Sequence, residues 1–176
     1  MIFTPSNLQG AFILDIKKIE DDRGFFARSF CRKEMEEHGL NTNMVQANCS
    51  FNKTKGTLRG LHMQNPPFEE SKLVRCTRGA IFDVIVDLRK DSQTFKQWLG
   101  VKLSASNHRM LYIPEGCAHG YITLEDATEV YYHVTEFYTS SAEVGFRWDD
   151  PAFNIQWPIQ PLNISQKDIN HLAYEF

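Results

Sequence analysis

The amino-acid sequence predicts an all-β fold, either a sandwich or a jelly roll closed well enough to enclose a pocket. Short apolar or alternating runs recur along most of the chain. Turn signals separate these runs at regular intervals, which is typical of antiparallel sheets. Helical patterns are confined to two short stretches, so we expect helices only at the periphery.

Nine runs predict strands in chain order. They cover residues 10–19, 43–51, 56–64, 72–79, 80–88, 97–104, 108–116, 120–124 and 128–138. The turn signals between them are Asp22-Arg23-Gly24, Asn65-Pro66-Pro67, Arg78-Gly79 and Pro114-Glu115-Gly116. Residues 32–39 predict a short helix with Gly39 as its C-terminal cap, and a second helix is expected to begin near residues 165–168.

Length and charge limit the classes of function. A chain of 176 residues fits one domain over residues 1–176, and no repeat or linker divides it. The net charge of −3 and the absence of long basic runs argue against nucleic-acid binding. The first residues lack a signal-peptide pattern, and no apolar run approaches 18 residues, so we expect a cytoplasmic protein that does not bind a membrane.

The four cysteines are expected to be reduced thiols in the core. They lie in apolar or strand-like contexts without CxxC spacing, at Cys31, Cys49, Cys76 and Cys117. A nucleophilic Cys117 beside His119 is the functional alternative. It carries little weight, because adjacency in sequence is not the geometry that a Cys-His pair requires.

Strand alternation sorts the polar residues by face. In residues 45–51 the polar side chains alternate with apolar ones, so one face is polar. Asp83 and Asp87 share a mixed face and are expected to be solvated or turn-facing. Arg59 and His62 have opposite parity, so both can face one cavity only if the strand is irregular. Gly60 lies between them and is the natural place for a bulge.

The segment around His119 resembles a cupin motif. Pro114, Gly116 and His119 form the pattern P-x-G-x-x-H. Metal-binding cupins usually add an H-x-H pair and a carboxylate, ligands that suit a transition metal. Here that stretch reads His62-Met63-Gln64, with one histidine where two are wanted, so no metal is expected. Taken alone, His119 is better explained as a packed histidine at a strand end after a turn.

Further motifs recur in a specific order over nearly the whole chain. They are DDRGFF at 21–26, QAN at 46–48, LRGLH at 58–62, KLVR at 72–75, GAIFDV at 79–84, YIPEGCAHG at 112–120 and RWDDP at 147–151. With these motifs the sequence resembles the dTDP-4-dehydrorhamnose 3,5-epimerases, which are metal-free cupins of deoxysugar-nucleotide biosynthesis. The resemblance implies a double-stranded β-helix with short peripheral helices, an isomerase without cofactor, and a nucleotide-diphosphate sugar as substrate.

The resemblance also implies catalytic roles for four residues. Such an enzyme inverts C3, C5 or both beside the C4 ketone of a 4-keto-6-deoxyhexose, through an enolate. His62 matches the general base, and Asp168 matches the carboxylate that orients it. Lys72 matches the cation near the C4 oxygen. Tyr132 matches the acid on the opposite face, with Tyr131 as the alternative, since only one of the two can point inward.

Nucleotide binding is implied for a second set. The matching positions are Arg23, Gln46, Asn48, Arg59, His119, Glu143 and Lys167. Arginine forks suit a diphosphate. Without the resemblance, Arg23 is as well explained as a turn residue and Glu143 as a surface charge.

Several positions depart from the commonest family pattern. Arg28 stands where an acidic residue is frequent, and an arginine there would prefer an acceptor such as cytosine N3 over the thymine N3–H. Glu70 stands where Gln is frequent, and Met63 and Cys117 stand where aromatic residues are frequent.

Three kinds of function therefore remain open. The first is an epimerase, or a related ketoisomerase, on a dTDP-, CDP- or GDP-linked keto sugar. The second is a metal-dependent cupin enzyme, and the third is a non-catalytic sugar-nucleotide-binding protein. The resemblance further implies a homodimer formed by strand exchange, with Phe25-Phe26 near the partner's site, and a role in dTDP-rhamnose supply for cell-surface polysaccharide.

Overall fold

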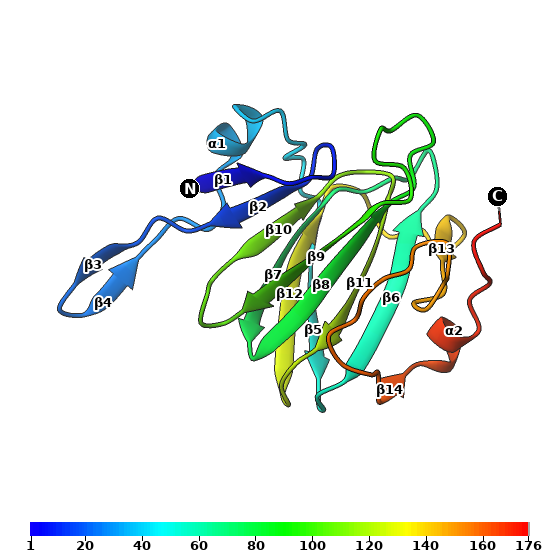
Figure 1. Cartoon of the computed structure of the whole chain (residues 1–176). Coiled ribbons are helices and arrows are strands. Elements are labelled where there is room, and N and C mark those ends of the chain that lie inside the picture. Colours follow the sequence, from blue (N-terminus) through cyan, green and yellow to red (C-terminus); the bar gives the residue numbers. More distant parts are fainter. Residues whose placement is uncertain (176) are drawn as a thin grey trace.

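The computed structural model describes residues 1–175 and contains two facing antiparallel sheets, the arrangement of a cupin-like jelly roll (Figure 1). In the first sheet the strands lie in the order β1 (Ile2–Pro5), β2 (Phe12–Asp15), β10 (Met110–Ile113), β7 (Lys72–Arg78), β12 (Thr128–Val134) and β5 (Gln46–Asn52). In the second the order is β13 (Glu143–Gly145), β6 (Thr57–Gln64), β11 (Cys117–Thr123), β8 (Ala80–Asp87) and β9 (Trp98–Ser104). The predicted all-β jelly roll is confirmed.

Five smaller elements complete the described chain. They are the hairpin strands β3 (Ile19–Asp21) and β4 (Gly24–Phe26), helix α1 (Arg32–Glu36), strand β14 (Asn163–Ile164) and helix α2 (Gln166–Ile169). Strand β14 pairs in parallel with the start of β6, which brings α2 against that strand. Neither helix is long and apolar enough to cross a membrane.

Most predicted elements form, with shifted bounds. Helix α1 lies inside the predicted range, and Gly39 after it has a φ of +71°. The predicted run 10–19 is wrong as one strand, because residues 16–18 separate β2 from β3. Strands β1, β4, β13 and β14 were not predicted. They have two to four residues each, too few for an alternating pattern to be recognised.

Strand β8 is buried on both faces and joins two apolar layers. Ile81 and Ile85 pack between the sheets, whereas Val84 and Val86 pack on the outer face of the second sheet against Phe153. The chain after β13 covers this outer face (Figure 1). The C-terminal segment is thereby fixed against the sheet that carries β6.

The expectation that Asp83 and Asp87 are solvated or turn-facing is wrong for Asp83, whereas Asp87 does face the turn after β8, although it is not solvated. Both are fully buried, because their face of β8 points between the sheets. Asp83 accepts a hydrogen bond from His119 Nε2 at 2.8 Å, and Asp87 binds Arg89, Ser92 and Thr94. Burial favours the protonated form of Asp87, but these hydrogen bonds outweigh it and lower its pKa to about 2.

Strand β5 is turned with its polar face inward. Gln46, Asn48 and Ser50 are partly buried, whereas Cys49 and Phe51 are exposed. The prediction of core cysteines is therefore wrong for Cys49, which lies on the outer surface. Cys31 is half-buried and only Cys76 and Cys117 are in the core, all four being free thiols. The inward polar face is the first sign of a polar cavity.

The predicted irregularity at Gly60 is confirmed. His62 pairs with His119 and Arg59 pairs with Tyr121, so three steps along β6 correspond to two steps along β11. Gly60 has a φ of +116° and lies against Gly120: a Cβ on Gly60 would be 2.5 Å from the Gly120 Cα. Only glycine fits this position, and the extra residue turns Arg59 and His62 toward the same cavity.

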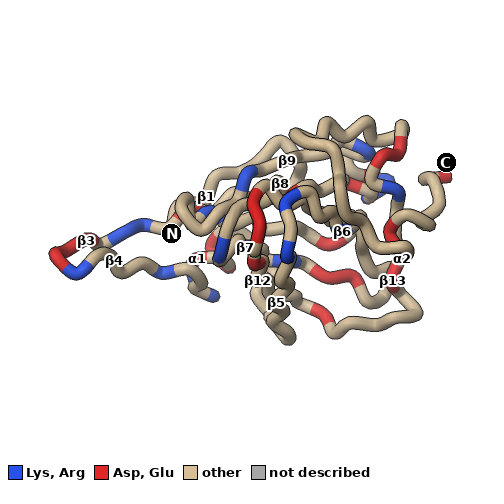
Figure 2. The backbone as a smooth tube through the Cα atoms, turned by 90° about the horizontal axis from the view of Figure 1, so that it is seen from below, with Lys and Arg blue, Asp and Glu red and all other residues tan. Residues whose placement is uncertain are grey.

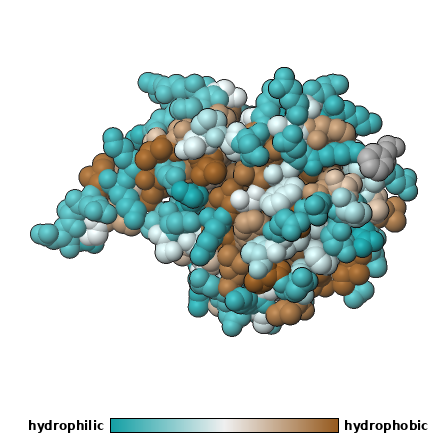
Figure 3. Space-filling model, viewed as in Figure 1, coloured by the Kyte–Doolittle hydropathy of each residue, from teal (hydrophilic) through white to brown (hydrophobic). Residues whose placement is uncertain are grey.

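The β3–β4 hairpin projects away from both sheets (Figures 1 and 2). Acidic and basic residues gather at its tip, and brown hydrophobic atoms lie along its length in Figure 3. Ile19 and Phe26 are 67% and 71% exposed, and Phe25 is 43% exposed. A hairpin with so much apolar surface is unusual for an isolated chain.

Replacing Gly60 by alanine should disrupt the bulge. The overlap with the Gly120 backbone and the positive φ should cost at least about 2 kcal/mol of unfolding free energy. Turnover should fall by more than the loss of folded protein explains, because the bulge sets the directions of the Arg59 and His62 side chains. Chemical denaturation and turnover should be measured together.

Gly39→Ala is the matched control: Gly39 has a positive φ but open space around it, so this variant should lose only about 1 kcal/mol and keep its activity. Equal effects in both variants would contradict this assignment.

Candidate active site

A polar cavity of about 310 Å³ lies between the two sheets. Its lining comprises Ser50, Arg59, His62, Lys72, His119, Gly120, Tyr121, Tyr132, Ser165, Lys167 and Asp168. A smaller cavity of about 140 Å³ adjoins it and shares His62, Lys72 and Tyr132. The four residues predicted to be catalytic are thus brought together, although they come from β6, β7, β12 and α2.

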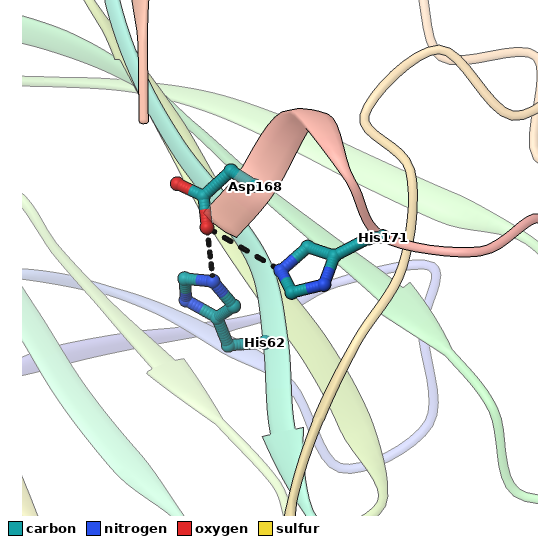
Figure 4. A group of neighbouring side chains, drawn as sticks. All are labelled: His62, Asp168 and His171. Carbon is teal, nitrogen blue, oxygen red and sulfur yellow. Dashed lines mark hydrogen bonds and ion pairs between the residues drawn. The ribbon is translucent and has the colours of Figure 1, made fainter. Parts of the chain in front are cut away.

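His62 and Asp168 form a hydrogen-bonded pair across the edge of the cavity (Figure 4). His62 Nε2 lies 2.7 Å from Asp168 Oδ1, and an ionised carboxylate can only accept, so Nε2 carries the proton. The other ring nitrogen, Nδ1, is left with a lone pair. A neutral imidazole oriented in this way can act as a base.

Helix α2 holds Asp168 in place. The backbone N–H of Asp168 donates to Ser165 Oγ, which caps the helix, and the Gly60 N–H lies 3.5 Å from Asp168 Oδ2. Burial favours the protonated carboxyl, but the hydrogen bond and charge of His62, together with the contacts to Ser165 and the Gly60 N–H, outweigh it and hold the pKa of Asp168 below its ordinary value. The carboxylate therefore stays ionised beside the imidazole.

Lys72 and Tyr132 face His62 from the opposite sheet. They lie on the neighbouring strands β7 and β12 and line both cavities. Burial raises the pKa of Tyr132, so its phenol keeps its proton at neutral pH. Tyr131 points to the other side of the sheet, toward His133, which resolves the alternative that the sequence left open.

The Lys72 ammonium has a carboxylate partner in the second cavity. Lys72 Nζ lies 3.0 Å from Glu70 Oε1, and both side chains are largely buried. Glu70 is one of the departures noted in the sequence. An ion pair removed from water in this way fixes the direction of the ammonium toward the cavity.

Three positively charged or ionisable groups line the mouth of the larger cavity. Arg59 is exposed and its Nε donates to Asn52 Oδ1 at 2.8 Å, which leaves its terminal nitrogens for a ligand. Lys167 Nζ pairs with Glu143 Oε2 at 2.6 Å. His119 is fixed by Asp83 from beneath. Arg59 and Lys167 supply donors that suit a diphosphate, and His119 adds an Nδ1–H donor only as an imidazolium, because its Nε2–H is given to Asp83.

Amide and acidic groups dominate the smaller cavity. Gln46, Asn48 and Glu143 line it, as expected for ligand contacts, and Gln46 Oε1 accepts from the Tyr138 N–H. Burial raises the pKa of Glu143, but hydrogen bonds from Lys167 and Tyr138 outweigh it and lower the net value. The structure therefore brings ten of the twelve predicted site residues to the two cavities.

Arg23 and Arg28 lie outside both cavities. Arg23 is at the tip of the β3–β4 hairpin and pairs with Asp21, and Arg28 pairs with Glu34 at 2.7 Å. The Glu34 pairing occupies the side chain whose presence suggested a cytosine-linked substrate. Within one chain, Arg28 therefore gives that alternative no support.

Two further sequence expectations concern His119 and its neighbours. Burial raises the pKa of Cys117 to about 12, so a thiolate nucleophile at this position is not favoured. Within residues 1–175, the group of side chains with metal-ligand atoms close together is not the cupin pattern around His119 but His62, Asp168 and His171.

Sequence reasoning missed several residues of the site. His171, Asp83 and Tyr121 contact the predicted residues, and Tyr121 donates or accepts at Ser50 Oγ. His171 is three residues after Asp168, and a second imidazole at that spacing was the available signal. Asp83 was predicted to be solvated or turn-facing, because alternation cannot tell which face of a strand buried on both sides meets a polar partner.

Comparison with known proteins gives one consistent result. The family model for dTDP-4-dehydrorhamnose 3,5-epimerase matches residues 5–175. An epimerase of this name from Shigella flexneri is 48% identical over 166 residues, which cover 94% of this chain and 91% of the relative.

Two solved structures have the same fold. A dTDP-4-dehydrorhamnose 3,5-epimerase from Bacillus anthracis, with TDP and PPi bound, is 43% identical with a TM-score of 0.94 and coverage of 98% and 99% of the two chains. The dTDP-6-deoxy-D-glucose-3,5-epimerase from Legionella pneumophila, in complex with dTDP-4-keto-L-rhamnose, is 37% identical with a TM-score of 0.91 and coverage of 98% and 92%. The chain therefore belongs to the dTDP-4-dehydrorhamnose 3,5-epimerase family.

Proposed function

We propose that this chain epimerises C3 and C5 of dTDP-4-dehydro-6-deoxy-D-glucose to give dTDP-4-dehydro-L-rhamnose, without a cofactor. One observation supports this function most directly: a His-Asp pair on one sheet faces a lysine and a protonated tyrosine on the other, across a cavity. Family membership and relatives solved with TDP or a dTDP-sugar support the substrate class.

The reaction requires a base and an acid on opposite faces of the sugar. His62 Nδ1 removes the proton from the carbon beside the C4 ketone, and the resulting charge moves to the C4 oxygen. The Lys72 ammonium stabilises this enolate, because a charge in a site with little water acts strongly. Tyr132 then gives its proton to the carbon from the other face, which inverts the centre. Solvent then restores the proton to Tyr132 and accepts the proton that His62 removed, so both groups return to their starting states.

Asp168 acts through His62. It holds the imidazole in the tautomer with a free Nδ1 lone pair, and its negative charge stabilises the imidazolium that forms when the proton is taken. Arg59, His119 and Lys167 are proposed to hold the diphosphate. Gln46, Asn48 and Glu143 are proposed to contact the rest of the nucleotide.

We also propose that the protein is a homodimer and that the partner's hairpin completes the site. The support is the projecting hairpin with its exposed Ile19, Phe25 and Phe26, and the position of Arg23 at its tip. Arg23 then reaches the diphosphate in the partner's cavity, as a charge supplied in trans. By the same family resemblance, we propose a cytoplasmic role in supplying dTDP-rhamnose for cell-surface polysaccharide.

Base and acid variants should fail in different ways in deuterated water. His62→Asn should lose about 10²–10⁴-fold of the turnover and all exchange, because no base remains. Tyr132→Phe should exchange substrate protons without inversion, since His62 still removes a proton and returns deuterium to the same face. Tyr131→Phe is the matched control and should behave as wild type. Mass spectrometry and NMR of the recovered sugar give both readouts, and inversion by Tyr132→Phe at the wild-type rate would exclude Tyr132 as the acid.

The dimer proposal predicts complementation between inactive chains. Arg23→Ala and His62→Asn should each be poorly active alone, but a hybrid dimer contains one intact site. When equal amounts of the two variants are unfolded, mixed and refolded together, half of the dimers are hybrids with one intact site of two. The mixture should therefore regain about one quarter of the wild-type rate. Phe26→Asp should shift the protein to monomer in light scattering, whereas Leu172→Asp, also exposed, should not. A wild-type monomer, or no recovery in the mixture, would contradict the proposal.

A further inference from the structure

Asp168 is shared by two imidazoles, of which the proposed mechanism uses only one. His171 follows α2, and Figure 4 shows its ring directed at the same carboxylate oxygen as the His62 ring. His171 Nε2 lies 3.3 Å from Asp168 Oδ1, and the two rings are 5.4 Å apart in an edge-on arrangement. The two nitrogens and the carboxylate oxygen all lie within 4.8 Å of one another.

The His171 nitrogen is buried without a hydrogen bond. Its distance to Asp168 falls within ion-pair range, but the geometry makes no hydrogen bond, and Nε2 has no other partner. A buried polar atom without a partner is uncommon and costly. The absence of a side chain at Gly145 is what admits the ring: a Cβ there would overlap three atoms of the His171 imidazole.

These three side chains have the composition of a transition-metal site. Two imidazoles and one carboxylate are the donors that bind Zn²⁺ and other divalent first-row ions. A tetrahedral Zn²⁺ with bonds of about 2.0–2.2 Å holds its donors about 3.4 Å apart. Asp168 Oδ1 lies 2.7 Å from His62 Nε2 and 3.3 Å from His171 Nε2, which is near this value. Rotation of one ring brings the two imidazole nitrogens to a similar separation from each other.

We propose that His62, Asp168 and His171 bind a divalent transition-metal ion such as Zn²⁺, and that the bound ion inhibits the enzyme. The ion reaches the site through the larger cavity, which His62 and Asp168 line. It replaces the Nε2 proton of His62 and takes the lone pair of His171 Nε2. Water from the cavity supplies the fourth ligand.

Inhibition follows from the loss of the pair, and this part rests on the proposed function. The metal binds the same Nε2 and Oδ1 atoms that form the hydrogen bond, so Asp168 no longer stabilises a positive imidazole. A dication on the ring also withdraws electrons from Nδ1, which weakens it as a base. Substrate in the cavity blocks the entrance and should protect the enzyme.

This site shares His62 with the H-x-H position of the cupin pattern, but its other two ligands, Asp168 and His171, lie outside that pattern. That pattern would also use His119, which pairs with His62 on the neighbouring strand β11, but His119 Nε2 is bound to the buried Asp83. His171 comes from the C-terminal segment and has no counterpart in the P-x-G-x-x-H or H-x-H motifs. The metal here is an inhibitor and not a cofactor.

Binding of Zn²⁺ alone to the whole protein tests the site without reference to activity. Calorimetry should find one ion per chain in the wild type. His171→Gln and Gly145→Ala should each weaken the affinity at least about tenfold, the first by removing a ligand and the second by displacing its ring. His133→Ala removes a histidine on the outer face and should bind as wild type. Thermal melts establish that each variant is folded. No binding by the wild type, or unchanged binding by His171→Gln, would overturn the proposal.

Activity assays separate this proposal from the proposed function. Zn²⁺ should inhibit wild-type turnover, a chelator should restore it, and His171→Gln should need at least about ten times more Zn²⁺ for the same inhibition. If Zn²⁺ binds through His171 but turnover is unaffected, the metal site stands and the assignment of His62 and Asp168 as the catalytic pair is wrong.

Discussion

The active site depends on one backbone constraint, the extra residue in β6 at Gly60. In a regular strand Arg59 and His62 would point to opposite faces, one into the cavity and the other away from it. The bulge turns both inward, and it needs glycine because the Gly120 backbone lies against the same point. The Gly60 N–H also lies beside Asp168, so the irregularity that turns His62 into the cavity lies against the carboxylate that binds its ring. The position of the C-terminal segment is therefore linked to the shape of one strand.

The two sheets divide the chemistry between them. The second sheet, with α2 packed on it, supplies the His62–Asp168 pair and the fixed His119, whereas the first sheet supplies Lys72 and Tyr132. A sugar ring between the sheets would meet the proposed base on one face and the proposed acid on the other, which is what inversion requires. Burial contributes to this division, because it keeps Tyr132 protonated while hydrogen bonds keep Asp168 ionised. Because Asp168 also lies beside His171, we propose that the same carboxylate lets a metal ion bind to the His62–Asp168 pair.

Alternation and turn signals were enough to predict the all-β fold, and the parity conflict between Arg59 and His62 was enough to predict the bulge. What the sequence could not supply was the identity of each face. Asp83 was predicted to be solvated because β8 alternates like a half-exposed strand. In the structure the C-terminal segment buries the outer face of β8, and the inner face, which carries Asp83, packs between the sheets. Cys49 is the opposite case: it was predicted to be in the core, but the apolar face of β5 that carries it lies on the outer surface. Arg23 is not brought to a cavity within the single chain, because the hairpin that carries it leaves the body of the fold.

The measurement that tests this account most directly is the location of deuterium in the product. The wild-type enzyme should be incubated with dTDP-4-keto-6-deoxyglucose in deuterated water, the product trapped by reduction, and the label placed by NMR and mass spectrometry. The account predicts deuterium at both C3 and C5, with inversion at each centre, because the same base, cation and acid serve both carbons beside the ketone. Product formed without deuterium at either carbon, or no reaction with this substrate, would contradict it.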